Sequence, residues 1–157
     1  VPERLPTDPN EVIREGAALL REMGAEKGIG LRVELDEALG VAALDRTAIY
    51  RAVLNLATNA IDACAERESG AVVVIGSHRL EDEAVLTVAD NGVGMSDETR
   101  SQLFTRFFTT KPGAGTGLGL PVVKKIVEEH GGTLQITTSP GKGSEFRMHL
   151  PRVAPDQ

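Results

Sequence analysis

The chain has 157 residues, of which 41% are hydrophobic and 25% charged, so it is long enough for one soluble domain with its own core. Its formal net charge of −6 argues against nucleic acid as a main partner. No apolar run approaches transmembrane length and no signal peptide is visible, so we expect a cytoplasmic domain, whether or not its parent protein is membrane-anchored. The single cysteine, Cys64, is expected to fill a small space in the core.

The first predicted elements are a short strand, a helix and a second strand. Residues 1–7 contain two prolines and look like an entering linker with one short edge strand. Asp8 is a suitable helix N-cap with Pro9 in the first turn, and apolar residues then recur at helical spacing until Gly24, where we expect the helix to end. Apolar and polar residues alternate over residues 31–35, which predicts a half-buried strand.

A second helix is predicted after Asp45, which can cap it, and after a short strand at residues 41–44. One face of this helix is apolar. Three polar side chains fall on a different face, at positions i, i+4 and i+7: Asn55, Asn59 and Asp62.

Two apolar runs at residues 72–75 and 84–89 predict buried strands that form a hairpin. Residues 93–115 show no clean period and exceed an ordinary loop, which is typical of lids and binding elements. A third helix is predicted from about Leu118 to His130, followed by an antiparallel strand pair. This order predicts an α+β fold, a two-layer α/β sandwich with three main helices on one face of a mixed, mostly antiparallel sheet.

Two clusters of glycine flank the predicted lid, at residues 90–95 (DNGVGM) and 113–120 (GAGTGLGL). Glycine lets the backbone approach a ligand closely, so the clusters indicate a nucleotide pocket. Neither cluster has the G-x-G-x-x-G spacing of a dinucleotide fingerprint, and the only Gly-Lys pair, Gly141 and Lys142, lacks the rest of a P-loop. The clusters therefore belong to another kind of nucleotide site.

The polar residues near these clusters have both ordinary and functional interpretations. Asp90 can form a turn before Asn-Gly, or it can accept a hydrogen bond from the exocyclic amine of adenine while Gly92 and Gly94 bring the backbone against the base. Asn55 and Asn59 can be solvated, or their amide oxygens can ligate Mg²⁺ beside phosphate oxygens and water. The residues alone leave these alternatives open.

The predicted lid raises the same question at Lys111. Its ammonium group can be solvated, or it can neutralise charge on a γ-phosphate. The backbone N–H groups of residues 115–119, with a helix N-terminus directly behind them, favour an anion site.

Taken in order, these motifs resemble the histidine-kinase branch of the gyrase/Hsp90/histidine-kinase/MutL ATP-binding superfamily, and most closely its nitrogen-regulation type. The resemblance covers residues 8–151 and implies a Bergerat-type fold with a long ATP lid from about residue 95 to 115, and with ATP and Mg²⁺ bound. It rests on five motifs: an N box (Asn55-x-x-x-Asn59-Ala60), a first glycine box (Asp90-x-Gly92-x-Gly94), an F box (Phe104-x-x-Phe107-Phe108-Thr109-Thr110-Lys111), a second glycine box (Gly115-Thr116-Gly117-Leu118-Gly119-Leu120) and a closing motif (Gly141-Lys142-Gly143-Ser144-x-Phe146).

The resemblance also implies roles for individual residues. Asn59 would coordinate Mg²⁺, Asn55 would lie near the phosphates, and Asp90 would bind the adenine amine. Lys111 and the backbone of residues 116–120 would hold the phosphates, and Asn55 and Lys111 are the expected catalytic residues. The full set of expected nucleotide contacts is Asn55, Asn59, Asp62, Ala63, Asp90, Gly92, Gly94, Met95, Lys111, Gly115, Thr116, Gly117, Leu118, Gly119, Leu120 and Ser144.

Position 55 separates two branches of this superfamily. ATP-hydrolysing relatives such as gyrase carry a glutamate four residues before the Mg²⁺-binding asparagine, where it acts as general base on water. Asn55 occupies that position here, and an amide cannot take a proton from water near neutral pH. Transfer to an external nucleophile fits better, because phosphoryl transfer depends mainly on positioning and charge stabilisation.

No acceptor for a phosphoryl group is recognisable in the sequence. We therefore expect residues 1–7 to be a linker from an upstream dimerisation domain that carries the acceptor histidine, residues 8–151 to be the ATP-binding catalytic domain, and residues 152–157 to be a tail. A charged imidazole is favourable at a helix C-terminus, where His130 is predicted to lie. All three histidines are interpreted as surface or structural residues: His78, His130 and His149.

The expected partners are ATP, the histidine-bearing dimerisation domain of the same parent and, indirectly, a response regulator, with the parent a homodimer and the isolated domain a monomer. Two other classes stay open. A related anti-sigma-type serine/threonine kinase would need a serine-bearing partner, and the FFTTK run at residues 107–111 counts against it. A nucleotide-dependent binding switch without chemistry is disfavoured by the intact glycine boxes.

Overall fold

The computed structural model describes residues 2–65, 67, 69–101 and 119–153. Its helices are α1 (Pro9–Glu26), α2 (Arg46–Ala63), the short α3 (Asp97–Ser101) and α4 (Gly119–Glu129). Its strands are β1 (Leu5–Thr7), β2 (Gly30–Glu34), β3 (Ala42–Leu44), β4 (Val72–Leu80), β5 (Glu83–Asp90), β6 (Thr133–Ser139) and β7 (Gly143–Pro151).

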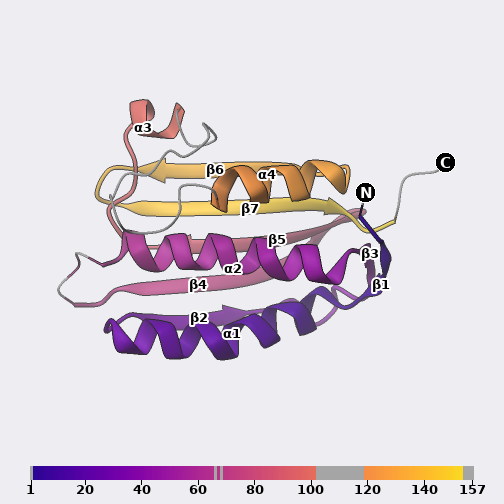
Figure 1. The fold of residues 1–157 in the computed structure, drawn as a ribbon, viewed down its shortest axis with the longest axis horizontal. Helices are drawn as coiled ribbons and strands as arrows, with labels where there is room; N and C mark the ends of the chain where they lie inside the picture. The colour runs from indigo at the N-terminus through magenta and orange to yellow at the C-terminus, as the bar shows by residue number, and fades with distance from the viewer. Residues whose placement is uncertain (1, 66, 68, 102–118, 154–157) are drawn as a thin grey trace.

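The main sheet has five strands in the order β2-β4-β5-β7-β6, and β1 and β3 form a separate antiparallel pair. The β2–β4 pair is parallel and the other pairs of the main sheet are antiparallel. Helices α1, α2 and α4 lie side by side on one face of this sheet (Figure 1). The predicted two-layer α+β sandwich is confirmed.

One aliphatic core fills the space between the helices and the sheet. On β7, Phe146, Met148 and Leu150 are buried while the intervening residues are not, as the alternation predicts. They meet apolar residues of α2 such as Val53 and Leu56, which are also buried. Each such side chain stabilises the fold by roughly 1.5–3 kcal/mol through the apolar area that it removes from water.

The expectation that the first helix ends at Gly24 is wrong by two residues, because α1 continues to Glu26. The left-handed turn that reverses the chain falls on Gly28, whose φ is +73°. Gly24 is small for another reason: a Cβ there would lie 2.6 Å from the carbonyl oxygen of Ile29, and the Ile29 N–H donates to the Gly24 oxygen at 2.8 Å. The returning chain needs that space.

The β4–β5 hairpin is confirmed, and β4 is longer than predicted. Its outer half, as far as Leu80, pairs with β5, for example through Arg79 opposite Ala84. His78, Arg79 and Leu80 are exposed, so this half of the strand carries no continuous apolar run.

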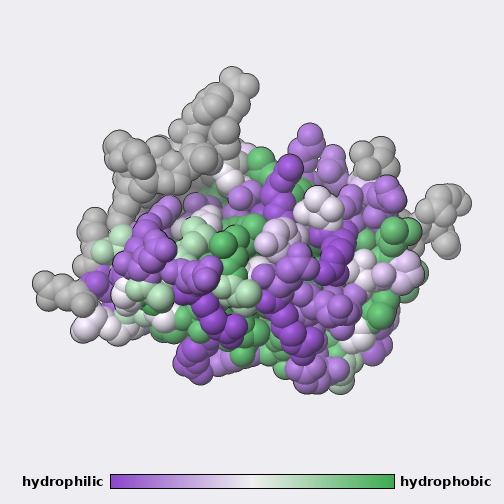
Figure 2. Space-filling model, turned by 60° about the horizontal axis from the view of Figure 1, so that its bottom comes forward, coloured by the Kyte–Doolittle hydropathy of each residue, from purple (hydrophilic) through white to green (hydrophobic). Residues whose placement is uncertain are grey.

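Figure 2 shows the molecule from the side of α1, where hydrophilic side chains cover most of the surface between small hydrophobic areas. Leu19 is a large apolar residue of α1 that is exposed. Among the described residues, no helix combines the length and the apolar character needed to cross a membrane.

Candidate nucleotide site

The first glycine cluster is fastened to the C-terminal end of α2. Asp90 is the last residue of β5, and its Oδ1 accepts the backbone N–H of Gly92 at 2.8 Å. The next residue, Val93, donates its N–H to the carbonyl oxygen of Ala63 at 3.1 Å. This turn therefore places the Asp90 carboxylate beside the last turn of α2.

Two glycines of this cluster stand where no other residue fits. A Cβ on Gly92 would collide with the carbonyl group of Ala63. Gly94 has a φ of +66°, and a Cβ there would collide with the carbonyl oxygen of Ser139 in the β6–β7 turn. In the structure the protein's own backbone makes this close approach, and the approach of a ligand at these glycines stays a prediction.

Asp90 carries a perturbed carboxyl group. Burial raises its pKa, and hydrogen bonds from the backbone N–H groups of Gly92 and Ser144 offset part of that effect. Ser144 lies opposite Asp90 on β7 and is buried. Its Oγ is 2.7 Å from Oγ1 of Thr138, which in turn accepts the backbone N–H of Met95 at 2.9 Å. The predicted residues Asp90, Ser144 and Met95 are therefore brought together.

Asn55 and Asn59 lie half-buried in the C-terminal half of α2. Within the described part of the chain, neither side-chain amide has a hydrogen-bond partner. The first residue of α4, Gly119, faces them: a Cβ placed there would lie 3.5 Å from Asn59 Nδ2 and 3.6 Å from Asn55 Cβ. The second glycine box thus ends against the two asparagines, although the two segments are far apart in the sequence.

The other predicted residues on these helices are half-buried, among them Asp62, Ala63 and Leu120. The Asp62 Oδ1 lies 3.8 Å from Nζ of Lys27, which follows α1. A direct nucleotide contact for these residues stays a prediction. Five predicted residues lie outside the described residues: Lys111, Gly115, Thr116, Gly117 and Leu118.

Sequence reasoning missed the structural role of Asn91. Its Oδ1 accepts the N–H of Val72 at 2.9 Å, and its Nδ2 donates to the carbonyl oxygen of Gly70 at 2.8 Å. The side chain thereby holds the turn after Asp90 against the start of β4. The Asn-Gly dipeptide marks a turn in the sequence, but nothing local identifies these two partners.

Cys64 is buried beside this turn, as expected for a core residue. Its Sγ lies 3.8 Å from Oδ1 of Asn91. Burial, together with the negative charge of Asp90, raises the pKa of the thiol, so it stays protonated at neutral pH.

His130 is structural, but the expectation that it favours a charged imidazole is wrong. The ring is buried, with Nδ1 2.8 Å from the carbonyl oxygen of Ile126, and Nε2 accepts the backbone N–H of Asp45 at 3.0 Å. Burial lowers the pKa of His130, and the nearby Arg4 adds to this. The helix-terminus effect is therefore outweighed by desolvation.

The described residues contain no group of three or more histidine, cysteine or acidic side chains able to hold a metal ion. A hard divalent cation at Asn59 would thus have one neutral amide oxygen from the protein here. Mg²⁺ is commonly bound by one or two protein ligands together with phosphate oxygens and water. The donor set fits a cation that arrives with a nucleotide.

The comparisons with known proteins agree with this geometry. Residues 44–154 match the model of the family described as histidine kinase-, DNA gyrase B-, and HSP90-like ATPase. The chain is similar to the sensor histidine kinase ZraS of Klebsiella oxytoca, with 38% identity over 92% of this chain and 30% of the relative. It is also similar to the C4-dicarboxylate transport sensor protein DctB of Rhizobium meliloti, with 37% identity over 94% of this chain and 23% of the relative. The chain thus spans less than a third of these curated relatives.

Solved structures give the same result. The nucleotide-free catalytic domain of histidine kinase ThkA superposes with a TM-score of 0.84 at 32% identity, covering 96% of this chain and 97% of that domain. Full-length ShkA in complex with AMPPNP superposes with a TM-score of 0.86 at 25% identity, covering all of this chain and 33% of ShkA. The chain therefore belongs to the histidine kinase-, DNA gyrase B- and HSP90-like ATPase family, and within it to the ATP-binding domains of sensor histidine kinases.

Proposed function

We propose that this chain binds Mg·ATP and transfers the γ-phosphate to a histidine on a separate dimerisation domain of its parent sensor kinase. One observation carries the proposal: α2 joins the two halves of the site. Its last residue, Ala63, accepts a hydrogen bond from the turn after Asp90. Its Asn59 and Asn55 lie one and two turns earlier, respectively, and face Gly119, the first residue of α4.

Asp90 is the proposed adenine-binding residue. The backbone N–H groups of Gly92 and Ser144 use part of the hydrogen-bonding capacity of the Asp90 carboxylate, and its remaining lone pairs can accept the exocyclic amine of adenine. Because Gly92 and Gly94 carry no side chains, the turn can pack closely against Ala63 and Ser139, and this packing would hold the Asp90 carboxylate in place for the base.

Asn55 and Asn59 are the proposed residues at the phosphate end. Their amides have no hydrogen-bond partner among the described residues, so they are available to a ligand at little cost. The Asn59 oxygen would hold Mg²⁺, which when bound neutralises charge on the phosphate oxygens. Lys111 and the backbone of residues 115–120 are proposed to complete the phosphate contacts.

Asn55 favours transfer over hydrolysis. A water molecule at the γ-phosphate would meet an amide at this position, and an amide does not accept a proton near neutral pH. In the proposed reaction an imidazole nitrogen of the partner forms a bond to the γ-phosphorus while the bond to the bridging oxygen breaks and ADP leaves. A neutral imidazole needs little base assistance, so positioning is the main task of this domain.

The remaining parts of the system follow from this proposal. Residues 1–7, which include β1, would join residues 8–151 to the upstream dimerisation domain of a homodimeric parent, and residues 152–157 would be a tail. A response regulator would receive the phosphoryl group from the histidine. This is supported by ThkA, which has been solved in complex with the response regulator TrrA and is 28% identical to this chain with a TM-score of 0.79.

Isothermal titration with ATP, with and without Mg²⁺, tests the nucleotide assignments. We expect binding that strengthens with Mg²⁺ and is lost in Asp90→Ala. Binding that survives this substitution would sink the adenine assignment.

Phosphotransfer tests the reaction itself. The domain is mixed with labelled ATP and with the dimerisation domain of its own parent, and the expected product is an acid-labile phosphohistidine on that domain. An acid-stable phosphoserine on a partner would favour the serine kinase, and binding without transfer to any partner would favour the switch. Asn55→Glu is expected to raise hydrolysis of ATP to free phosphate above the wild-type background.

A further inference from the structure

The ends of α2 and α4 that lie away from the candidate nucleotide site meet at His130. The two helices run antiparallel, because α2 begins after Asp45, α4 ends before His130, and Nε2 of His130 accepts the Asp45 N–H at 3.0 Å. At the other end, Gly119 lies against Asn55 and Asn59. With 11 residues in α4, roughly 16 Å separate the two contacts.

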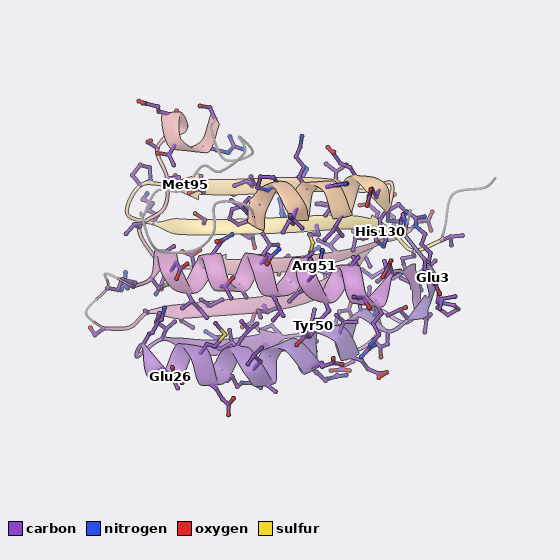
Figure 3. The ribbon with its side chains drawn as sticks, viewed as in Figure 1. Glu3, Glu26, Tyr50, Arg51, Met95 and His130 are labelled. Carbon is purple, nitrogen blue, oxygen red and sulfur yellow. The ribbon has the colours of Figure 1, made fainter. Side chains whose placement is uncertain are left out.

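The chain segment before β1 joins the same place. The backbone N–H of Glu3 donates to Oδ2 of Asp45 at 3.0 Å, and Nη2 of Arg4 donates to the carbonyl oxygen of Glu129 at 3.4 Å. Glu3 thus contacts the N-cap of α2 and Arg4 the last turn of α4. These residues, with His130, form what is named here the distal junction. Figure 3 shows Glu3 and His130 at one end of the molecule and Met95, the last residue of the first glycine cluster, at the other.

The hydrogen bonds of His130 require a neutral ring. Nδ1–H donates to the carbonyl oxygen of Ile126, so Nε2 must keep its lone pair to accept the Asp45 N–H. A second proton on Nε2 would set two N–H groups against each other in a buried place. Three charged groups face the ring: Arg4 from the N-terminal segment, Asp45 from the N-cap of α2 and Glu129 from α4.

The contact matters because the buried residues of α4 are all apolar. Val123 and Val127 of α4 are fully buried, and apolar contacts resist separation of two helices without fixing their position along the axis. A hydrogen bond between a ring nitrogen and one backbone N–H fixes that position. An axial shift of α4 would move Gly119 away from Asn55 and Asn59.

We propose that His130 is a positioning residue for the nucleotide site: as a neutral imidazole it fixes α4 along α2, and through Glu3 and Arg4 it connects this placement to the chain segment before β1. The proposal rests on the proposed function only in taking Asn55, Asn59 and Gly119 as parts of a nucleotide site. If His130 has this role, a change in the chain segment before β1 can alter nucleotide affinity through the distal junction.

Two substitutions at position 130 separate positioning from stability. Gln in place of His can present an oxygen near the position of Nε2 and accept the Asp45 N–H, whereas the shorter Asn can reach only the position of Nδ1. The dissociation constant of Mg·ATP is measured by calorimetry at a temperature where every variant is folded. We expect His130→Asn to weaken binding at least about fivefold, the lower end of coupling between sites, and His130→Gln to stay near wild type.

Two further variants test the connection to the N-terminal segment. Glu3→Pro removes the N–H that Asp45 accepts, and Glu3→Ala is its control because it keeps that N–H. We expect weaker Mg·ATP binding in Glu3→Pro than in Glu3→Ala. Leu20→Ala, a buried position on α1, serves as a control that loses stability without touching the distal junction.

The outcomes are distinguishable. If wild type does not bind Mg·ATP, the proposed function fails. Amide hydrogen exchange without nucleotide then still tests the distal junction. We expect faster exchange at the start of α2 and at the end of α4 in His130→Asn than in His130→Gln. If His130→Asn and Leu20→Ala lose similar stability and both bind Mg·ATP like wild type, His130 is only structural and the inference is overturned.

Discussion

The Oδ1 of Asp90 accepts the backbone N–H of Gly92 at 2.8 Å, so the carboxylate that ends β5 also shapes the turn that follows it. The same group is half-buried, and its pKa is raised by that burial. The proposed adenine contact needs the negative charge of Asp90, and holding this buried charge lowers the stability of the free protein.

This cost predicts opposite effects of Asp90→Asn on stability and on binding. A carboxyl whose pKa is raised on folding favours the folded state when it is protonated, and this contribution is lost as the pH rises through the folded pKa. At neutral pH, Asn removes the buried charge but keeps an oxygen for the Gly92 N–H. We expect the free energy of unfolding, measured in urea without nucleotide, to rise.

Nucleotide binding by the same variant should fall by about 10- to 150-fold, because a hydrogen bond to a charged group contributes about 1.5–3 kcal/mol. Asp82→Asn, at an exposed position in the β4–β5 turn, is the control and should change neither quantity. A variant that loses stability but keeps its affinity contradicts both assignments of Asp90.

A matched glycine pair tests the close approach in the first glycine cluster. Gly94 and Gly141 both have positive φ, +66° and +76°, but a Cβ on Gly94 would collide with the carbonyl oxygen of Ser139, whereas a Cβ on Gly141 meets nothing within 4 Å. Gly141→Ala should cost about 1–2 kcal/mol for the left-handed conformation alone. Gly94→Ala should cost more than about 3 kcal/mol, since strain and a backbone collision add.

Chemical denaturation of both variants measures this difference. Equal losses of unfolding free energy would show that the turn relaxes around the added methyl group. In that case the close approach of residue 94 to residue 139 is not a requirement of the fold.

Asn59→Ala should remove the effect of Mg²⁺ on ATP binding. The affinity of the variant with Mg²⁺ is expected to equal that of wild type in the presence of a chelator, because the only proposed protein ligand is gone. Arg51→Ala, on the exposed face of the same helix, controls for loss of a long side chain from α2. An unchanged response of Asn59→Ala to Mg²⁺ would exclude Asn59 as the ligand.

The neutral state of His130 predicts a pH dependence of stability. A group whose pKa is lowered on folding contributes stability that is present above its ordinary pKa and is lost as the pH falls through the folded value. The unfolding free energy of wild type should thus decline on acidification below the ordinary histidine range, and that of His130→Gln should decline less.

The unfolding free energies of wild type and His130→Gln must be compared because other groups also titrate. Burial of Asp45 acts to raise its pKa, but hydrogen bonds from the backbone N–H groups of Glu3 and Ala48 outweigh this effect and lower the pKa. The contribution of Asp45 to the free energy of unfolding is therefore lost only in more acidic solution. Urea titrations at a series of pH values give both curves. Parallel curves would mean that folding does not change the pKa of His130.

The sequence by itself determined the order of the elements and gave a prediction of the residues of the candidate site. Helix α2 could be predicted because its cap, Asp45, and its apolar spacing are local signals, and Asp45 does accept the Ala48 N–H at 3.2 Å. In the same way, the alternation of apolar and polar residues along β7 determined which side chains of that strand are buried. The motifs around Asn59 and Asp90 predicted the candidate nucleotide site through their resemblance to a family, because they combine fixed residue types with fixed spacing.

Tertiary structure decided what depends on segments distant in the sequence. Position 24 must be glycine because the chain passes close to it at Ile29. A sequence rule for the end of a helix takes no account of such a contact. Ser144 reaches Met95 only through Thr138 of the neighbouring strand. The charge state of His130 was predicted wrongly, because the helix terminus is a local signal, whereas burial and the Asp45 N–H come from folding. Local periodicity specifies elements, but desolvation and backbone collisions arise only when the elements pack together.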